Sequence, residues 1–355
     1  MTGMREVAAL ARVSAKTVSR VHNNDPHVAP ATRERVETAL RELNYVPNTL
    51  AITFRAGRAP VIGIAVPDLV DPFFGSIATS VGDLAMTQGM SIVVTNLGED
   101  PARERGIVES LLRQSLSGLV LAPISHDQSY LKAWTSRTPI VFVDRAPLQV
   151  SADSFVEDDH AGAYAATEHL IEHGHTVIAF LGDTFEIPTT RHRYAGYRAA
   201  LADHGIEVAT DLVALGAADR SGAAAALAQL ETAAVRPTAL FSSNARCTMA
   251  LVPALTRKDL AVTAFGDFPM ADMLSPAITV IDQDPARLGR LAGQRILDRV
   301  SHPGRRYRRR NVLPVTLVPR ESCLTTRAGD RLPVGGGPTV PRGLTECPRG
   351  PDRAA

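Results

Sequence analysis

The sequence contains little cysteine, few aromatic residues and no long apolar run. Its 355 residues include three cysteines, at positions 247, 323 and 346, and one tryptophan. An odd, scattered set of cysteines without a C-x-x-C pair argues against a disulfide framework and indicates a reducing compartment. No stretch reaches the roughly 18 apolar residues of a transmembrane helix, and the chain opens on an amphipathic pattern rather than a signal peptide. We therefore expect a cytoplasmic protein with no membrane partner.

Motifs of the common enzyme classes are also missing. The sequence has no G-x-S-x-G nucleophile elbow, no Walker loop and no dinucleotide-binding fingerprint. Residues 169–173, HLIEH, match the H-x-x-E-H pattern of zinc enzymes, but so short a match is frequent by chance and no third ligand follows at a plausible spacing. We therefore expect no catalytic residue, no metal and no cofactor.

Residues 4–23 have the pattern of two short helices joined by a tight turn. Val7 and Ala11 lie on one apolar stripe at helical spacing, and Val18 and Val21 lie on a second. Two such stripes can pack together, so the outward faces of both helices remain available for a partner.

The outer face of the second helix carries hydrogen-bonding groups. Ser14 can cap this helix, because its hydroxyl can accept from the unpaired N–H groups of the first turn. The predicted outer face consists of Ala15, Lys16, Thr17, Ser19, Arg20 and Asn23. Small side chains, two cations and several hydrogen-bonding groups suit a helix that lies in the major groove of DNA. A solvated amphipathic helix pair is the alternative.

A third helix and a positive charge complete this N-terminal head. Apolar residues repeat at helical spacing over residues 31–43. The first 58 residues contain nine basic and five acidic residues, a net charge of +4, whereas the whole chain carries +1, so the remainder carries −3. This asymmetry indicates a polyanion-binding head on a weakly acidic body.

The body alternates apolar strands with amphipathic helices. Strands are predicted at residues 61–66, 91–95, 118–121, 140–143, 177–181, 239–242, 262–265 and 278–281, and helices at 75–88, 102–114, 162–173, 191–204, 221–231, 245–255 and 285–300. Continuous apolar strands with intervening helices indicate parallel sheets that are covered on both faces. About 260 residues suit two lobes, with a ligand bound where the carboxyl ends of both sheets meet.

Two head segments, EVAALARVSAKTVSRVHNN and HVAPATRERVETALRELNYVPN, together with this body, resemble the lac repressor (LacI) family over residues 3–322. The resemblance implies a helix-turn-helix head, a two-lobed α/β body like that of periplasmic sugar-binding proteins, and three crossings between lobes, near residues 157–160, 283–285 and 316–320. The expected domains are a head at 1–46, a hinge at 47–59, a body at 60–322 (lobe 1 at 60–158 and 286–316, lobe 2 at 159–285 and 317–322) and a disordered tail at 323–355.

The resemblance assigns roles to residues of the head by position. Base contacts fall on Ala15, Lys16 and Arg20, and the physics agrees, because a guanidinium can donate two hydrogen bonds to guanine. Backbone contacts fall on Ser14, Thr17, Ser19, Asn23, Thr32, Tyr45 and Asn48. Hydroxyl and amide groups near helix N-termini suit phosphate oxygens.

Residues 45–58, YVPNTLAITFRAGR, correspond to the family's hinge helix. Leu50 and Phe54 lie one helical turn apart, and a helix of two turns is marginal alone in water, so it would fold on DNA. The family inserts a leucine into the minor groove, and Phe54 occupies that position here. The alternative is that Phe54 packs the two hinge helices of a dimer together.

Three departures from the family pattern fall in the head. Arg12 replaces the glycine of the turn and would cost roughly 1 kcal/mol if that position requires a positive φ. Ala29 replaces a capping serine of the third helix, at a cost of about 1 kcal/mol. His22 replaces a leucine. We therefore expect a less stable head whose DNA-facing groups are intact.

The resemblance also places effector-binding residues at strand ends in the body. These are Asp71, Phe73, Phe74, Asp144, Arg193, Asn244 and Asp267. Aromatic faces with carboxylates and a guanidinium suit a polyol, because CH faces stack and hydroxyl groups take paired hydrogen bonds. Structural alternatives remain open: both phenylalanines in the core, Asp71 as a helix cap, and Arg193 in an ion pair within one lobe.

The predicted effector set is incomplete. Gly266 replaces the first of two consecutive carboxylates, the one that clasps the effector in the family, and Ala245 follows Asn244 where an aspartate is common. The effector is therefore unusual or absent.

The sequence as a whole predicts a dimeric transcription regulator, most simply a repressor, of a pseudo-palindromic DNA operator. A small molecule, expected to be a carbohydrate, would control it from the cleft. The tail lacks the leucine heptads that make some relatives tetramers. The alternatives are control by a protein partner and nonspecific architectural binding. Residues 302–311, HPGRRYRRRN, are predicted to form a solvated turn, with phosphate binding as the alternative.

Overall fold

The computed structural model describes residues 4–22, 25–45, 59–257 and 259–323. Several predictions lie outside these residues: the backbone contacts of Asn23 and Asn48, the hinge residues Leu50 and Phe54, and the tail. In the described residues, no helix is long and apolar enough to span a membrane.

The head contains the three predicted helices, α1 (Met4–Leu10), α2 (Ala15–His22) and α3 (Pro30–Glu42). Val7, Val18 and Val36 are completely buried and form the centre of its small core. The predicted cap is confirmed, since the Thr17 amide donates to Ser14 Oγ at 3.1 Å.

Both expected weaknesses of the head are present. Arg12 has a φ of 54°, in the region that favours glycine. Ala29 precedes α3 and provides no side-chain hydrogen bond to its first turn. The head therefore combines strain in one turn with an uncapped helix around a small core.

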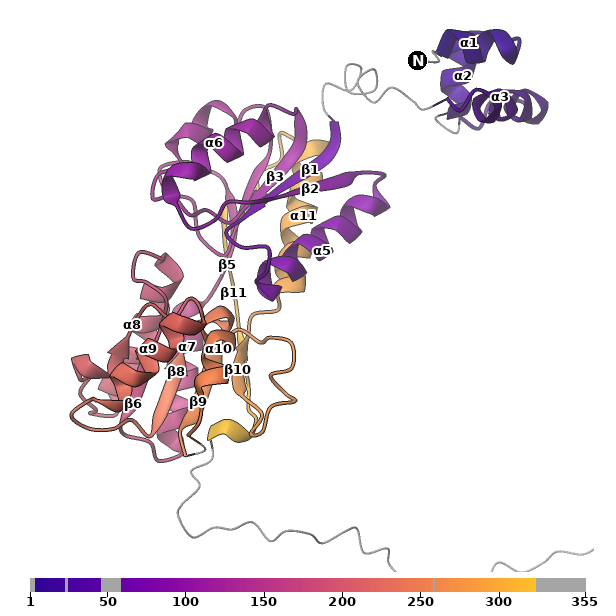
Figure 1. Cartoon of the computed structure of the whole chain (residues 1–355). Helices are drawn as coiled ribbons and strands as arrows, with labels where there is room; N and C mark the ends of the chain where they lie inside the picture. The colour runs from indigo at the N-terminus through magenta and orange to yellow at the C-terminus, as the bar shows by residue number, and fades with distance from the viewer. Residues whose placement is uncertain (1–3, 23–24, 46–58, 258, 324–355) are drawn as a thin grey trace, which may run out of the picture.

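The body consists of two α/β lobes, which confirms the predicted fold class (Figure 1). Lobe 1 contains one six-stranded sheet in the order β11 (Arg310–Leu313), β5 (Asp153–Glu157), β4 (Ile140–Val143), β3 (Leu116–Leu121), β1 (Ala59–Val66) and β2 (Ser91–Asn96). All of its strands are parallel. Helices α5 (Pro72–Thr87) and α11 (Pro285–Ser301) cover one face, and α6 (Pro101–Leu112) with the short helix η1 (Ser129–Ala133) covers the other.

Lobe 2 repeats this design. Its sheet has the order β12 (Thr316–Val318), β10 (Thr279–Asp282), β9 (Ala261–Phe265), β8 (Ala239–Ser242), β6 (Ile178–Leu181) and β7 (Val213–Ala214). Only β12 is antiparallel to its neighbour. Helices α7 (Asp159–Glu172) and α8 (Pro188–Asp203) cover one face, and α9 (Arg220–Glu231) and α10 (Ala245–Leu251) cover the other. Three short helices, η2 (Thr210–Leu212), η3 (Val252–Ala254) and η4 (Glu321–Cys323), complete the lobe.

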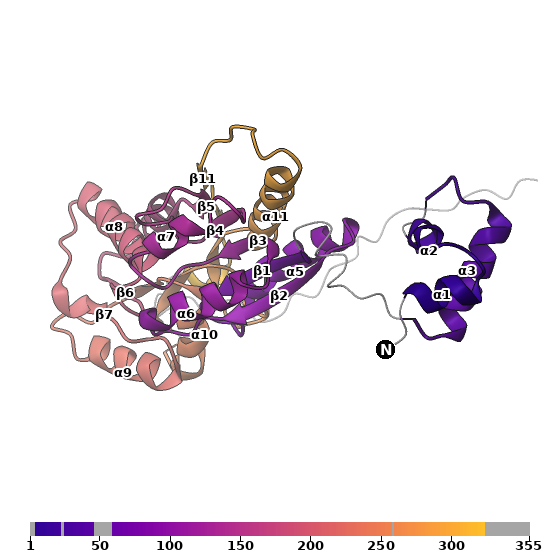
Figure 2. The same cartoon turned by 90° about the horizontal axis from the view of Figure 1, so that it is seen from above.

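The chain passes between the lobes three times (Figures 1 and 2). It leaves lobe 1 after Glu157, returns after Asp282, and leaves again between Leu313 and Thr316. The last passage lies just before the predicted segment 316–320, because those residues already form β12 and its continuation. Four strands, β5, β7, β11 and β12, were not among the predicted strands.

Candidate functional site

The exposed face of α2 carries the predicted base-contacting residues. Ala15, Lys16 and Arg20 are exposed, whereas Val18 and Val21 on the opposite side are buried. Of the predicted backbone-contacting residues within the described chain, Ser14 is exposed, and Thr17, Ser19, Thr32 and Tyr45 are partly exposed. The head thus presents a polar, cationic helix surface of the kind that enters a nucleic-acid groove.

Asp25, which the sequence analysis did not single out, holds Arg20 in the isolated chain. Arg20 Nε donates to Asp25 Oδ2 at 2.7 Å, and the amide of His27 donates to the other carboxylate oxygen at 2.9 Å. The hydrogen bond from Arg20 holds the pKa of Asp25 well below its usual range. This contact uses only Nε, so the Nη1 and Nη2 groups of Arg20 stay available for a base.

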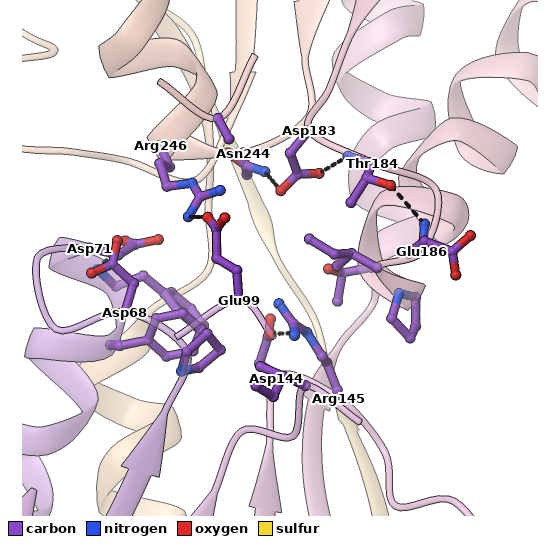
Figure 3. A pocket seen from close by; sticks show the side chains of 18 of the residues that line it. Asp68, Asp71, Glu99, Asp144, Arg145, Asp183, Thr184, Glu186, Asn244 and Arg246 are labelled. Carbon is purple, nitrogen blue, oxygen red and sulfur yellow. Dashed lines mark hydrogen bonds and ion pairs between the residues drawn. The ribbon is translucent and has the colours of Figure 1, made fainter. Parts of the chain in front are cut away.

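A cavity of about 400 Å³ lies between the two lobes, where the carboxyl ends of their strands meet (Figure 3). Lobe 1 contributes Pro67, Asp68, Asp71, Phe73, Phe74, Gly98, Glu99, Pro101, Ile124, His126, Asp144 and Arg145. Lobe 2 and the return crossing contribute Asp183, Thr184, Glu186, Ile187, Pro188, Thr189, Arg193, Ala218, Asn244, Ala245, Arg246 and Gln283. Parallel sheets place polar loop residues at this edge, so the cavity follows directly from the topology.

Six of the seven predicted effector residues line this cavity, and Asp267 does not. Asp267 forms an ion pair with Arg320, at 2.7 and 3.1 Å, in lobe 2. The sequence suggested Asp267 because it follows Gly266 directly, but Arg320, 53 residues later, holds its carboxylate outside the cavity. We therefore correct that assignment.

Asp71, Phe73 and Phe74 have structural as well as cavity-lining positions. Asp71 Oδ1 accepts from the Phe73 amide at 2.9 Å and so caps α5. Burial raises the pKa of Asp71 to about 6, although the hydrogen bond from Phe73 opposes this shift. The two rings meet edge to face, with centroids 5.0 Å apart, and belong to the lobe 1 core. The structural alternatives for these residues therefore hold alongside their position in the cavity.

Arg193 is fixed by three contacts within lobe 2. Its Nε donates to Asp159 Oδ1 at 2.7 Å, and its Nη1 donates to the Ser243 carbonyl at 2.8 Å. The guanidinium carbon lies 3.8 Å from the centre of the Phe265 ring. Burial alone would lower the pKa of Arg193, but Asp159 and Asp144 outweigh it and raise the pKa. Arg193 therefore lines the cavity as a preorganised cation.

A buried carboxyl group lies beside this cation at the first lobe crossing. Glu157 is 3% exposed, and neither of its side-chain oxygens has a hydrogen-bond partner within the described residues. Burial, followed by the charges of Asp144 and Asp159, raises the pKa of Glu157 well above its ordinary value. Glu157 thus holds its proton more strongly than an exposed glutamate does.

An ion pair and a contact between a histidine and a carboxylate join the lobes across the cavity. Arg246 Nη1 of lobe 2 lies 2.8 Å from Glu99 Oε1 of lobe 1 (Figure 3). His126 Nε2 of lobe 1 lies 3.4 Å from Glu186 Oε2 of lobe 2. Sequence reasoning missed Glu99, His126 and Glu186, and the only available signal was their position after strand ends.

Gly266 changes the chemistry at the base of the cavity. It has a φ of 88°, and a Cβ placed there would lie 2.8 Å from Gln283 Oε1 and 3.3 Å from Ala245 Cβ. The end of the Gln283 side chain thus occupies the space that a residue at 266 would need. A neutral amide therefore stands where the family pattern has a carboxylate.

The H-x-x-E-H segment has an ordinary helical environment. His173 Nδ1 lies 2.7 Å from the His169 carbonyl oxygen, and the two rings have centroids 4.3 Å apart. Across residues that the structure describes, no three His, Cys, Asp or Glu side chains gather in a possible metal site. The following Gly174 has a φ of 87°, the left-handed conformation that commonly ends a helix.

Comparison with known proteins places both parts of the chain in one family. Residues 3–48 match the family model "Bacterial regulatory proteins, lacI family", and residues 167–323 match "Periplasmic binding protein-like domain". The ribose operon repressor of Escherichia coli (strain K12) is 30% identical over 325 residues, which cover 89% of this chain and 98% of that protein.

Solved structures agree with this assignment. The lac repressor dimer bound to operator and the anti-inducer ONPF is 27% identical, with a TM-score of 0.79, over 91% of this chain and 99% of that one. The complex of the transcriptional regulator CelR with cellobiose is 28% identical, with a TM-score of 0.66, over 91% of this chain and 100% of that one. The chain belongs to the LacI family and is a DNA-binding transcriptional repressor.

Proposed function

We propose that this protein is a dimeric repressor that binds a pseudo-palindromic operator. A small polar effector would lower or raise its affinity for that operator. The observation that carries this proposal is the pairing of an exposed, cationic α2 face with a cavity lined from both lobes. In the proposed complex, Arg20 contacts guanine through its Nη groups while Nε stays on Asp25, Lys16 and Ala15 contact neighbouring bases, and the serine and threonine hydroxyls of α2 contact phosphates. Two heads in a dimer would match two half-sites.

The proposed effector is a carbohydrate or a related hydroxylated metabolite. Phe73 and Phe74 supply aromatic surface, and Arg193 and Asn244 supply donors at the opposite wall. Six acidic and three arginine side chains line the cavity, so a strongly anionic ligand would meet repulsion. The similarity to the ribose operon repressor and to the CelR–cellobiose complex supports a sugar. Gln283 beside Gly266 favours a ligand group that pairs with an amide rather than with a carboxylate.

The proposed mechanism is thermodynamic linkage between the cavity and the head. A ligand between the lobes would change the contacts Glu99–Arg246 and His126–Glu186, and so the angle between the lobes. Because lobe 1 continues directly into the segment that leads to the head, a change in lobe angle alters the geometry of the two heads. DNA and effector must then change each other's affinity by the same factor.

The linkage is tested by titrating the purified protein with ribose, cellobiose and related sugars, with and without its operator duplex. We expect one sugar to bind with different affinities in the two conditions, and the operator affinity to shift by the same factor. Two unequal factors would contradict the mechanism.

A second candidate is control by a protein partner with no small effector. It is favoured by the missing carboxylate at Gly266 and by two contacts, Glu99–Arg246 and His126–Glu186, that already span the cavity. Operator affinity that no sugar changes, but that a co-purifying protein does change, would favour this candidate.

A further inference from the structure

The connection between α11 and β11 carries a dense group of arginines that the cavity and the head do not use. We call residues 302–310, HPGRRYRRR, the arginine loop. Its five arginine side chains, at 305, 306, 308, 309 and 310, are all exposed. Among the described residues, none of these five guanidinium groups lies within ion-pair distance of a carboxylate. The loop is therefore an uncompensated cationic surface.

Contacts with two arginines of α11 hold the loop in place from beneath. Tyr307 is partly buried, and its ring lies 4.6 Å from the guanidinium carbon of Arg295 and 4.7 Å from that of Arg299. Arg299 Nη1 donates to the Arg305 carbonyl at 3.0 Å, and Arg295 Nη1 donates to the Arg308 carbonyl at 3.1 Å. These bonds fix the backbone, and the guanidinium carbon of Arg305 lies 5.2 Å from the centre of the same ring, while all five loop arginines stay exposed.

An acidic group beneath the loop, Asp153, is already paired with two arginines. Asp153, at the start of β5, lies 2.8 Å from Arg299 and 3.3 Å from Arg295. One carboxylate thus faces two arginines of α11 and offers nothing to the loop above. The surface charge of the loop is therefore available to an anionic partner.

The loop lies at the end of lobe 1 where the head is attached (Figures 1 and 2). Strands β11, β5, β4, β3 and β1 are parallel, so all begin at the same edge of the sheet. β1 begins at Ala59, immediately after the segment that joins it to the head, and β11 begins immediately after the arginine loop. Four strand spacings separate β11 from β1, or about 19 Å.

We propose that the arginine loop is a second DNA-contacting surface, which binds phosphates of the duplex that flanks the site held by the head. Arginine pairs well with phosphate, and such contacts depend on backbone charge rather than on sequence. An acidic protein or an anionic membrane would also attract this charge. DNA is favoured because the DNA-binding head leaves the body from the same edge of the sheet.

The test compares the salt dependence of DNA binding in full-length variants. Arg306→Gln/Arg308→Gln removes two loop charges, and Arg198→Gln/Arg220→Gln removes two exposed charges from lobe 2 as a control. On a random-sequence duplex of about 60 base pairs, we expect the slope of log affinity against log salt to fall by about 2 to 4 in the loop variant, because the two subunits of a dimer together lose four charges and each lost phosphate contact lowers the slope by roughly 0.9. The control variant should keep the wild-type slope, and Arg306→Lys/Arg308→Lys should restore it.

Duplex length provides a second readout. On a duplex of about 20 base pairs, which spans two half-sites and little more, the loop variant should bind like wild type. Equal slopes for wild type and the loop variant on the long duplex, with an unchanged midpoint of thermal unfolding, would overturn the proposal. Loss of binding to phosphatidylserine vesicles without a change in the DNA slope would also overturn it and assign the loop to a membrane. Since random DNA is used, the result does not depend on the operator or the effector.

Discussion

The head and the body each contain an arginine–aspartate pair with the same 2.7 Å separation, in opposite surroundings. In the head, Arg20 and Asp25 have side chains that are 45% and 28% exposed. In the body, Arg193 and Asp159 are 5% and 6% exposed. An exposed ion pair contributes little to the stability of the fold, because water and salt compete for both partners. Breaking a buried ion pair costs more, because the remaining charge has neither a partner nor water around it. The comparison separates an arginine that is free to change partners from one that is fixed in place.

The buried pair should give the largest effect. Arg193→Ala should lower the free energy of unfolding of the body by about 3–5 kcal/mol, because Asp159 would remain buried and unpaired. Denaturant unfolding of the full chain measures this change. Arg193→Ala/Asp159→Asn should recover much of the loss, and a single variant as stable as wild type would show that water already reaches the pair.

Asp71 should make the stability of the body depend on pH. Its pKa of about 6 lies above the unfolded value near 3.9, so folding favours the protonated form. This contribution is complete below pH 4 and is lost as pH rises through 6. Asp71→Asn keeps a capping group and should be more stable than wild type by roughly 3 kcal/mol above pH 7, since each pKa unit corresponds to about 1.4 kcal/mol. The difference should vanish near pH 4, and a difference independent of pH would contradict the role of the carboxyl group.

The exposed pair should affect recognition instead of stability. Arg20→Ala should reduce discrimination between operator and unrelated DNA by roughly 5- to 150-fold and leave the unfolding of the body unchanged. Competition binding with both duplexes measures this ratio. Lys16→Ala provides a comparison on the same helix, and unchanged discrimination in Arg20→Ala would remove Arg20 from base contact.

The smallest expected effect concerns the turn of the head. Arg12→Gly should stabilise the head by about 1 kcal/mol, because glycine adopts the φ of 54° without strain. The midpoint of thermal unfolding of the head measures this gain. Arg5→Gly, within α1, should instead destabilise the head, and equal effects of both substitutions would argue against strain at position 12.

The helices and strands were predictable wherever the spacing of apolar residues in the sequence matched the residues that are buried in the structure. The three head helices and the apolar strands follow from the spacing of their apolar residues. β5, with the sequence DSFVE, was missed because it buries Asp153 and Glu157, which look like solvent-facing residues. Asp153 is neutralised by arginines more than 140 residues later, and no local pattern reveals such a pairing.

The candidate site was predictable to the extent that it follows strand ends. Asp71, Arg193 and Asn244 lie at the carboxyl edges of the sheets, so topology alone directed them to the cavity. The contacts across the cavity depend on how the two lobes are placed relative to each other. The spacing of residues within a short segment does not reveal that placement. The assignment of Asp267 to the cavity was wrong for the same reason, since its partner Arg320 lies in the segment that follows the last lobe crossing.

Genome-wide capture of DNA fragments by the purified protein, at near-physiological salt, tests sequence-specific DNA binding most directly. Our account predicts enrichment of a few near-palindromic sites, and loss of that enrichment in Arg20→Ala. Broad capture without a shared sequence, fading steeply as salt rises, would mean that the head binds only phosphates. That result would contradict the proposed operator-binding repressor.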